Sequence, residues 1–485
     1  MKEDGYYFMD SPGNDLESIA GQVAAGCNLI FFTTGNGSIT NFPFVPTIKV
    51  VTTTERFELL SKDMDVNAGQ YQDGLPMDKL GSQTFDLMLR IASGQKSVGE
   101  QAGHSQVQIW RDWQQTDDSQ IKNLNNASVP NGIPLPIRTD VESENRDFSF
   151  SISNGGSRRQ IGLILPTSLC AGQVANMITA DLNEKRVGQP DHLSRFVALA
   201  HTEGCGNSGG NAEELYARTM VGYIHHPMVR HCLLLEHGCE KTHNAFMRNQ
   251  IVKMGGDPDR LGFASIQLDG GIEQVSQKVK SWFADQIQMS STPLTAQDKV
   301  GLEGLRIGIM TDGTPSKESA EQLATLTKCI VGSGGLVVVP DNSDLFATPS
   351  YRDAVLKQPT VNPSLAYGEH AKQVGFHMME TPTEHWVETM TGLGATGVEI
   401  ILALVNDRPM QVHPFVPVLQ MADKPVVQQT YASDLDLLLT GSPAVWNEQI
   451  LERIKQVIEQ SYSSQLYQQG NVDFQFTRGR FGVSL

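Results

Sequence analysis

Apolar residues in this chain fall into short runs that stop at small or polar residues. In the middle of the chain, three such runs each stop at a cysteine, and they cover residues 162–170, 196–205 and 232–239. Runs of this length, bounded by Gly and Ser and separated by helix-like stretches, predict parallel strands in βαβ units. Ligands of such sheets bind beyond the carboxyl ends of the strands. Cys170, Cys205 and Cys239 are therefore expected to meet in one crevice, with His201, His237 and His243 close by.

The same pattern divides the chain into four parts. They are a first unit at 1–115, a linker at 116–146, a central α/β domain at 147–374 and a last unit at 375–485. Strands are expected in the first unit at 6–9, 28–33 and 46–52, and later in the central domain at 261–267, 305–310 and 335–339. The linker is poor in apolar residues and rich in Asn, Asp, Ser and Pro, which break regular structure.

The last unit repeats the first one. Gly5-Tyr-Tyr-Phe-Met-Asp-Ser-Pro12 aligns with Gly375-Phe-His-Met-Met-Glu-Thr-Pro382, and Pro-Phe-Val-Pro occurs at both 43–46 and 414–417. This agreement in order and spacing indicates a duplicated folding unit and not a solenoid, whose repeats are far shorter. The predicted fold is therefore α/β, with a parallel, Rossmann-like central sheet flanked by two duplicated α/β units.

Composition and charge exclude several classes of protein. The chain of 485 residues has a formal net charge of −17, which argues against binding to nucleic acid phosphates. No apolar run approaches the roughly 18 residues of a membrane span, and the first residues lack the features of a signal peptide. Six cysteines are too few for a disulfide scaffold in a chain of this length. We therefore expect a cytoplasmic protein with reduced thiols that binds neither nucleic acid nor a membrane.

Two groups of motifs carry a resemblance to a known family. The first group is Phe8-Met-Asp-Ser-Pro-Gly-Asn14, Phe32-Thr-Thr-Gly-Asn-Gly-Ser38 and Asp63-Met-Asp-Val-Asn-Ala-Gly69. The central group is Ala198-Leu-Ala-His-Thr-Glu-Gly-Cys-Gly206, His237-Gly-Cys-Glu240 and Ile266-Gln-Leu-Asp-Gly-Gly271. In these motifs the chain resembles the altronate and galactarate dehydratase family of hydro-lyases. The resemblance implies an enzyme that removes water from an aldonate or aldarate sugar acid and yields a 2-keto-3-deoxy acid.

Dehydration of a 2,3-dihydroxy acid requires removal of the proton next to the carboxylate and expulsion of the 3-hydroxyl group. The resemblance implies that iron assists, and Cys170, Cys205 and Cys239 are candidate ligands for Fe²⁺ or for an iron–sulfur cluster. Taken alone, these cysteines fit better as small apolar side chains in a core, and the resemblance makes the two interpretations about equal. His201 and Glu240 are the candidate catalytic residues. The structural alternatives are a histidine satisfied by a backbone carbonyl and a glutamate favoured by the dipole at a helix start.

Candidate substrate-binding residues lie mostly in the first unit. Backbone N–H groups of its Gly-rich loop are suited to hold a carboxylate, with a plain turn as the alternative. The loop residues in question are Thr33, Thr34, Gly35, Gly37 and Ser38. Lys49 is expected to project from a strand towards an anionic substrate, although a solvated lysine is the commoner case. Arg158 is the arginine retained from an Arg-x-x-Gly-Arg motif that the resemblance places before the central domain.

The chain also departs from the family pattern. The family's carboxyl-terminal unit stands first, an expected Cys-Gly-Gly-Ser-Asp segment reads Thr311-Asp-Gly-Thr-Pro315, and an expected arginine is Asn36. These departures leave a non-catalytic sugar-acid-binding or regulatory paralogue as one alternative. A sulfo-lyase acting on a sulfonated hydroxy acid is another, because that branch looks similar. The expected partners are the sugar acid, a small separate subunit carrying the family's amino-terminal module, and a second copy in a homodimer.

Overall fold

The computed structural model describes residues 4–109, 129–138, 148–153, 160–189, 193–205, 210–290, 297–358 and 361–479. Within these ranges helices alternate with strands, and three sheets consist of parallel strands only. A two-stranded antiparallel sheet, β4 (Phe150–Ser153) beside β9 (Gln297–Val300), is added to them. The predicted α/β class is therefore confirmed. Arg158 lies outside the described residues.

The first unit contains a three-stranded sheet in the order β1-β2-β3. Its elements are α1 (Asp15–Ala24), β1 (Ile30–Thr34), β2 (Thr47–Val51), α2 (Thr54–Leu59), β3 (Val66–Asn67), η1 (Ala68–Tyr71), α3 (Met77–Ala92) and α4 (Val98–Ala102). Local capping sets the helix starts: Asn14 accepts a hydrogen bond from the Leu16 N–H, and Ser97 with Glu100 forms a capping box. The strand expected at 6–9 is not formed, because no strand lies beside it within the described residues.

The middle of the chain forms a four-stranded parallel sheet in the order β6-β5-β7-β8. Its elements are β5 (Ile161–Pro166), α6 (Leu169–Glu184), β6 (Arg195–Ala198), α7 (Gly210–Ile224), β7 (Val229–Glu236), α8 (Asn244–Lys253), η3 (Pro258–Arg260), β8 (Gly262–Ser265) and α9 (Gly271–Ser290). All six residues of β5 are buried, as expected for a strand covered by helices on both faces. β5, β6 and β7 end shortly before Cys170, Cys205 and Cys239, as the apolar runs predict.

The last sheet has six parallel strands in the order β12-β11-β10-β13-β14-β15. Its strands are β10 (Arg306–Asp312), β11 (Leu336–Pro340), β12 (Gly375–Met379), β13 (Ile400–Val405), β14 (Val418–Ala422) and β15 (Leu437–Leu438). Its helices are η4 (Leu302–Gly304), α10 (Lys317–Gly332), α11 (Asp344–Ala347), α12 (Pro349–Val355), α13 (Trp386–Ala395), α14 (Pro425–Tyr431), η5 (Pro443–Val445), α15 (Trp446–Ile458) and α16 (Gln465–Gln468). In chain order this arrangement is 3-2-1-4-5-6, the order of a doubly wound Rossmann-type sheet.

This topology corrects one grouping made from the sequence. The apolar runs at 305–310 and 335–339 are assigned there to the central domain, but β10 and β11 belong to the six-stranded sheet. β10 pairs with β13, so that Gly308 lies beside Ile401. A run of consecutive apolar residues indicates that its strand is covered on both faces, but it does not indicate which sheet the strand joins. The order 3-2-1-4-5-6 is therefore found in the last sheet, whereas the sheet that carries the cysteines has the order 2-1-3-4, as in flavodoxin-like doubly wound sheets.

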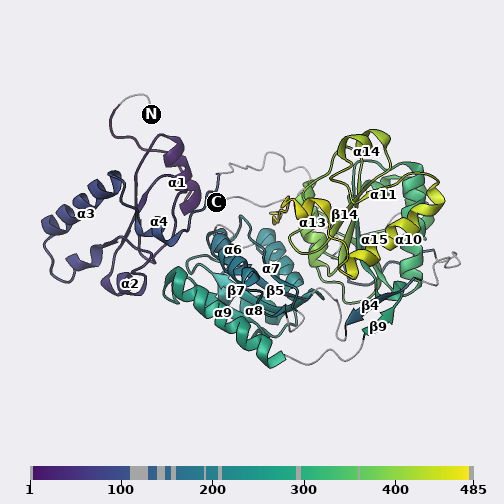
Figure 1. Ribbon diagram of the computed structural model, residues 1–485, viewed down its shortest axis with the longest axis horizontal. Coiled ribbons are helices and arrows are strands. Elements are labelled where there is room, and N and C mark those ends of the chain that lie inside the picture. Colours follow the sequence, from purple (N-terminus) through teal and green to yellow (C-terminus); the bar gives the residue numbers. More distant parts are fainter. Residues whose placement is uncertain are drawn as a thin grey trace.

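The two related units share one backbone plan. In both, a helix, two strands, a helix, a short strand and a helix follow one another: α1-β1-β2-α2-β3-α3 and α13-β13-β14-α14-β15-α15. The strand registers also correspond, since Ile30 lies beside Thr47 and Ile401 lies beside Val418. Figure 1 places the first unit and the six-stranded sheet on opposite sides of the four-stranded sheet. The half of the six-stranded sheet that contains β13, β14 and β15 thus has a second copy in the first unit, formed by β1, β2 and β3.

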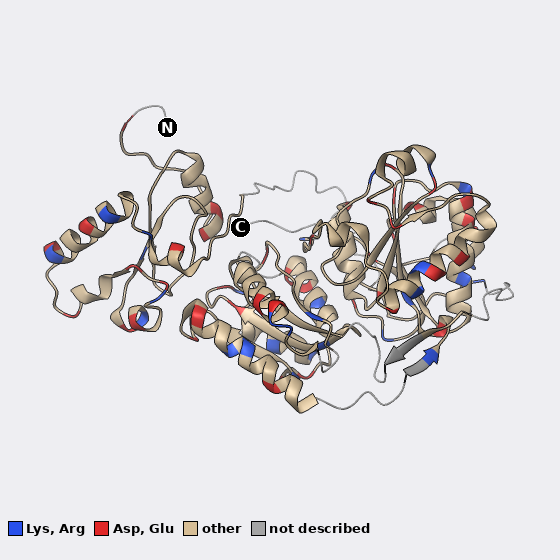
Figure 2. Cartoon of the chain, viewed as in Figure 1, with Lys and Arg blue, Asp and Glu red and all other residues tan. Residues whose placement is uncertain are grey.

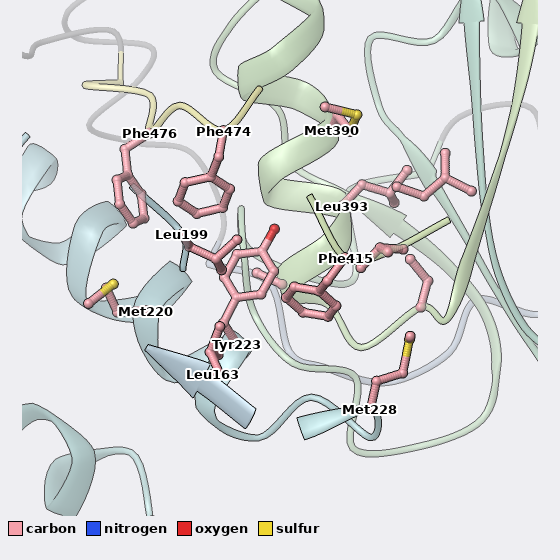
Figure 3. Close-up of a cluster of buried hydrophobic side chains, with 14 of the residues drawn as sticks. Leu163, Leu199, Met220, Tyr223, Met228, Met390, Leu393, Phe415, Phe474 and Phe476 are labelled. Carbon is pink, nitrogen blue, oxygen red and sulfur yellow. The ribbon is translucent and has the colours of Figure 1, made fainter. Parts of the chain in front are cut away.

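The four-stranded and six-stranded sheets share an apolar core. Figure 3 shows part of it, where Tyr223 of α7 and Phe415 of the last unit lie side by side under Phe474 and Phe476. Charged residues of both signs occur along α9 (Figure 2). No helix among the described residues combines the length and apolar character needed to cross a membrane.

Candidate active site

Two of the predicted metal ligands lie in contact at the carboxyl edge of the four-stranded sheet. The sulfur atoms of Cys170 and Cys205 are 3.9 Å apart. The hydrogen bond to Cys205, together with burial, raises the pKa of Cys170 well above its usual range. Desolvation and the nearby Cys205 raise the pKa of Cys239 to about 12. Cys205 therefore acts on both other thiols, and Cys170 and Cys239 stay protonated at neutral pH unless a cation is present.

A second cluster of donor atoms lies on the turn after β7. His237, Cys239 and Glu240 each contribute one metal-ligating atom, and these atoms lie within 4.8 Å of one another. His237 Nδ1 is 3.2 Å from the Cys239 sulfur. The His237 ring is fully buried, and burial lowers its pKa, so the imidazole is neutral and its lone pair can serve a metal.

Glu240 organises this turn. Its carboxylate accepts hydrogen bonds from the Thr167 hydroxyl (2.8 Å) and from the N–H groups of His237 (2.8 Å) and Gly238 (2.7 Å). Burial alone would raise its pKa, but the neighbouring His237 and these hydrogen-bond donors hold the pKa below its ordinary value. The helix that follows begins at Asn244, so Glu240 is not a helix-start residue. The geometry shows a carboxylate that holds the His237–Cys239 turn in place.

His201 is satisfied by a backbone carbonyl, which is the structural alternative to a catalytic role. Its Nε2 bonds the Pro166 carbonyl (2.8 Å), and its Nδ1 accepts the Glu203 N–H (3.1 Å). Burial lowers the pKa of this ring to about 4. Both ring nitrogens are occupied by backbone groups, so His201 is not placed to take a proton from a substrate.

Replacement of His201 by glutamine tests this assignment. We expect the free energy of unfolding to fall by about 1–3 kcal/mol, because buried backbone groups lose their partners. The pH dependence of any catalysed reaction should keep its shape, because the ring is not the base. Chemical denaturation and a pH–rate profile on the same preparation measure the two effects. Loss of the acid limb of that profile, without a loss of stability, would show that His201 is the base after all.

The first unit covers this edge of the four-stranded sheet. Ile39 packs into the core of the sheet, and its N–H points to His237 Nε2 at 3.4 Å. Leu16 of α1 contacts Leu169 and Cys170. The side chain of Gln106 donates to the Leu169 carbonyl (2.7 Å). The cysteines therefore lie at the boundary between two units, which is a common place for a ligand site.

Two of the family-like motifs meet at this boundary. Asp63 of the first unit accepts a hydrogen bond from the Ile272 N–H (3.0 Å) at the start of α9. Gly271 precedes it with φ +87°, and a Cβ there would overlap the Asp63 carboxylate. Arg56 donates to the Gln267 carbonyl (3.0 Å) from the same side. Asp63 therefore caps a helix of another unit.

The Gly-rich loop of the first unit is largely closed on itself. The Thr34 hydroxyl accepts hydrogen bonds from the N–H groups of Gly37 and Ser38, both at 3.0 Å. The Ser38 hydroxyl donates to Asp15 (2.7 Å) at the start of α1. Thr33 and Thr34 belong to β1. The N–H groups of Gly37 and Ser38, both candidates for carboxylate binding, thus already donate hydrogen bonds within the loop. These two residues form a plain turn.

Lys49 is buried, although a solvated lysine was the commoner expectation. Only 1% of its surface is exposed, and burial lowers the pKa of its amine. A Cβ on Gly99 would overlap its Nζ and approach the Asn41 side chain, so the amine lies between these two residues. The backbone of Lys49 is held by Asp65, whose carboxylate accepts its N–H (2.9 Å).

His104, which no sequence signal identified, lies beside this lysine. Burial and the Lys49 charge lower its pKa to about 3. Neither ring nitrogen makes a well-formed hydrogen bond within the described residues, and the Asn41 Oδ1 atom is likewise unpaired there. His237 also acts on the His104 ring electrostatically, so these polar groups connect Lys49 to the cysteine cluster. Unpaired buried polar atoms of this kind mark a place where a polar ligand can bind.

Comparison with known proteins supports this arrangement of units. Residues 1–115 match the family model described as D-galactarate/altronate dehydratase, C-terminal, and residues 156–288 match the one described as D-galactarate dehydratase/altronate hydrolase, second domain. Together the two matches take in the first unit and the sheet that carries the cysteines. The chain belongs to the altronate/galactarate dehydratase family.

Individual members of this family match a shorter stretch. Altronate dehydratase of Bacillus subtilis (strain 168) is 34% identical over 112 residues, which are 23% of this chain and 22% of that protein. Galactarate dehydratase (L-threo-forming) of Escherichia coli (strain K12) is 33% identical over 109 residues, 22% of this chain and 21% of that protein. The (2R)-sulfolactate sulfo-lyase subunit beta of Chromohalobacter salexigens is 29% identical over 108 residues, 22% of this chain and 28% of that protein. The chain thus spans 21–28% of the length of these curated relatives.

One further cation near the site of this dehydratase-family chain comes from the end of the six-stranded unit. Arg478 makes two hydrogen bonds to the buried Glu203 carboxylate, from Nε at 3.0 and 2.9 Å. Gln475 contacts the same carboxylate at 3.3 Å. Glu203 lies between His201 and Cys205, so the last described residues of the chain bind directly to the cysteine-bearing loop. Nothing in the spacing of the sequence predicts this contact.

Proposed function

We propose that this chain acts as a sugar-acid dehydratase that converts an aldonate or aldarate to a 2-keto-3-deoxy acid. The relatives named altronate dehydratase and galactarate dehydratase support the reaction class. The observation that carries the proposal is the cluster of Cys170, Cys205, His237, Cys239 and Glu240 at the ends of three parallel strands, covered by the first unit.

The donor set fits a single iron ion. In a tetrahedral site with metal–sulfur bonds of about 2.3 Å, two sulfurs on one ion lie about 3.8 Å apart. Cys170 and Cys205 are 3.9 Å apart, which suits one shared ion better than separate irons of a cluster. Cys239 and His237 are the remaining proposed ligands. The charge of the ion would reverse the raised pKa values of the thiols, and when bound it would act as a Lewis acid on the substrate carboxylate.

The residues of the first unit would bind the substrate beside this ion. Lys49 supplies a cation to the sugar-acid carboxylate, and the unpaired atoms of Asn41 and His104 supply hydrogen bonds. Glu240 positions the His237–Cys239 turn, and His201 has no proton-transfer role. The deep burial of Lys49 excludes bulk water, so its interaction with a carboxylate is stronger than a surface ion pair.

Replacement of Lys49 by methionine tests this role. We expect kcat/KM for the sugar acid to fall about 10- to 100-fold, because one charged hydrogen bond is worth about 1.5–3 kcal/mol. Lys62→Met removes an exposed lysine of the same unit, which pairs with Glu273, and serves as the control. An unchanged kcat/KM in Lys49→Met would contradict the role.

The same variant has a second readout in the pH dependence of stability. Burial lowers the native pKa of Lys49, so between that value and 10.5 the unfolded chain binds more protons than the folded one. Stability from this group therefore rises with pH across that window and is lowest below it. Lys49→Met should remove this rise, as measured by urea denaturation at several pH values, whereas Lys62→Met should keep it.

A sulfo-lyase is the second candidate, and the sulfo-lyase subunit among the relatives favours it. Loss of a sulfonate from the carbon next to the carbanion needs the same proton removal, so the same residues would serve. Protein purified without oxygen should contain about one iron per chain and should release a keto acid from a panel of aldonates and aldarates. Sulfite release from sulfolactate would instead assign the sulfo-lyase. Iron-free protein that binds these acids without product would identify a non-catalytic paralogue.

A further inference from the structure

A cavity of about 410 Å³ lies at the end of the four-stranded sheet opposite to the cysteine cluster. One wall is formed where β5, β6 and β7 begin, by Ile161, Arg195 and Met228. The other wall is segment 460–463 of the last unit, between α15 and α16. β5 has six residues, so at about 3.3 Å per residue the cavity is roughly 15–20 Å from the strand ends that carry the cysteines. It is therefore separate from the proposed active site.

Arg195 brings a positive charge to this cavity without a carboxylate to balance it. Its guanidinium donates to the Pro414 carbonyl from Nη2 (3.3 Å) and lies 4.7 Å from the centre of the Tyr467 ring. Within the described part of the chain, no carboxylate forms an ion pair with it, and its buried Nε atom makes no hydrogen bond. Burial lowers the pKa of Arg195, but a guanidinium remains charged at neutral pH. A bound anion would offset the cost of burying this cation.

The rest of the lining combines hydroxyl and amide groups with a small apolar floor. The polar residues are Ser194, Gln460, Ser461, Ser463 and Gln468. The Ser194 and Ser461 hydroxyls donate to backbone carbonyls at 2.9 and 3.2 Å, so their lone pairs remain able to accept hydrogen bonds. Ile161 and Met228 belong to the shared apolar core, and Figure 3 shows Met228 at its lower edge. Such a surface suits a carbon chain that carries several hydroxyl groups.

We propose that this cavity is a second ligand site, which binds a small polyhydroxylated compound bearing one oxyanion, either a carboxylate or a phosphate. Arg195 binds the oxyanion, and the serine and glutamine side chains bind the hydroxyl groups. The cavity volume lies within the range of about 300–1,000 Å³ that small-molecule sites occupy. The site does not depend on the proposed dehydration, because none of its residues belongs to the cysteine cluster. The structural alternative is an arginine that only joins β6 to Pro414.

Three compounds separate the parts of this chemistry. Gluconate carries a carboxylate and hydroxyl groups, glucose 6-phosphate carries a phosphate and hydroxyl groups, and inorganic phosphate is an oxyanion alone. Gluconate or glucose 6-phosphate, added to the full chain, should slow amide hydrogen exchange in 193–197 and 459–468. The dissociation constant from this protection should be at least about tenfold lower than that of inorganic phosphate, because the hydroxyl groups add hydrogen bonds. Tighter binding of gluconate would assign a carboxylate ligand, and tighter binding of glucose 6-phosphate a phosphate ester.

Two variants and a control complete the test. Arg195→Met should weaken binding of the tighter compound at least about tenfold, because a charged hydrogen bond is lost. Ser463→Phe narrows the cavity and leaves the bond from Arg195 to Pro414 in place, so it tests the site independently of any folding defect in Arg195→Met. Arg260→Met removes an exposed arginine paired with Asp257 and should bind like the unsubstituted chain.

Three results would overturn the proposal. The first is protection by none of the compounds at this cavity, or protection only at 236–240, which would come from the proposed active site. The second is unchanged binding in both Arg195→Met and Ser463→Phe, because the ligand would then lie elsewhere. The third is inorganic phosphate binding as tightly as the two sugar compounds, because the polar lining would then contribute nothing to the ligand.

Discussion

Replacement of Cys205 by serine is expected to abolish iron binding and to reduce dehydration at least about 100-fold. Cys205 lies 3.9 Å from Cys170, and its thiol is among the groups that raise the pKa values of both Cys170 and Cys239. A serine hydroxyl is a poor ligand for a metal held by soft sulfur donors. Loss of one ligand from a four-coordinate site typically removes the ion, and with it several kcal/mol of transition-state stabilisation. Metal analysis and keto-acid release on anaerobically purified protein measure both effects.

The control for this prediction is Cys27→Ser. Cys27 is a free, half-buried cysteine of the first unit and is not part of the cluster at the strand ends. It should keep its iron and its activity. Thermal unfolding of Cys205→Ser without added metal should match that of the unsubstituted apoprotein, because serine nearly preserves the volume of the side chain. Full iron content in Cys205→Ser would mean that the site uses other donors, and the iron proposal in its present form would be wrong.

Replacement of Arg478 by methionine is expected to lower the free energy of unfolding by about 3–5 kcal/mol. The reason is that Glu203 is buried, and methionine would leave its carboxylate without the cation that it contacts through both oxygens. The nearby Phe474 and Phe476 pack in the core shared by the four-stranded and six-stranded sheets. We therefore also expect faster proteolysis of the last described residues. Urea denaturation and limited digestion measure these changes.

The double variant Glu203→Gln/Arg478→Met separates charge from packing. It removes the unpaired buried charge and should recover most of the lost stability, because removing both partners of a buried pair costs far less than removing one. Lys185→Met breaks an exposed ion pair with Asp181 and should leave the denaturation midpoint unchanged. Equal destabilisation by the single and double variants would show that the arginine acts through packing alone.

Several features of the site follow from local sequence. Three apolar runs ending at cysteines predict three parallel strands that end at one edge, and the distance between Cys170 and Cys205 agrees with that geometry. The duplication was visible from order and spacing, because a shared backbone plan preserves Gly and Pro at turns. These properties depend on residues close in sequence or on a period along the chain.

Other features depend on contacts between distant residues, which no local pattern records. Whether Lys49 is solvated or buried depends on α4 lying against β2, and whether the Gly37 N–H is free depends on the Thr34 rotamer. From the sequence alone, His201 is a candidate base. In the structure, backbone groups of Pro166 and Glu203 are hydrogen-bonded to both of its ring nitrogens. β10 and β11 could join either sheet, because burial on both faces leaves the same apolar run in each case. The sequence pattern of segment 5–9 predicts a strand that the structure does not form. An apolar alternation becomes a strand only where a neighbouring strand accepts its hydrogen bonds.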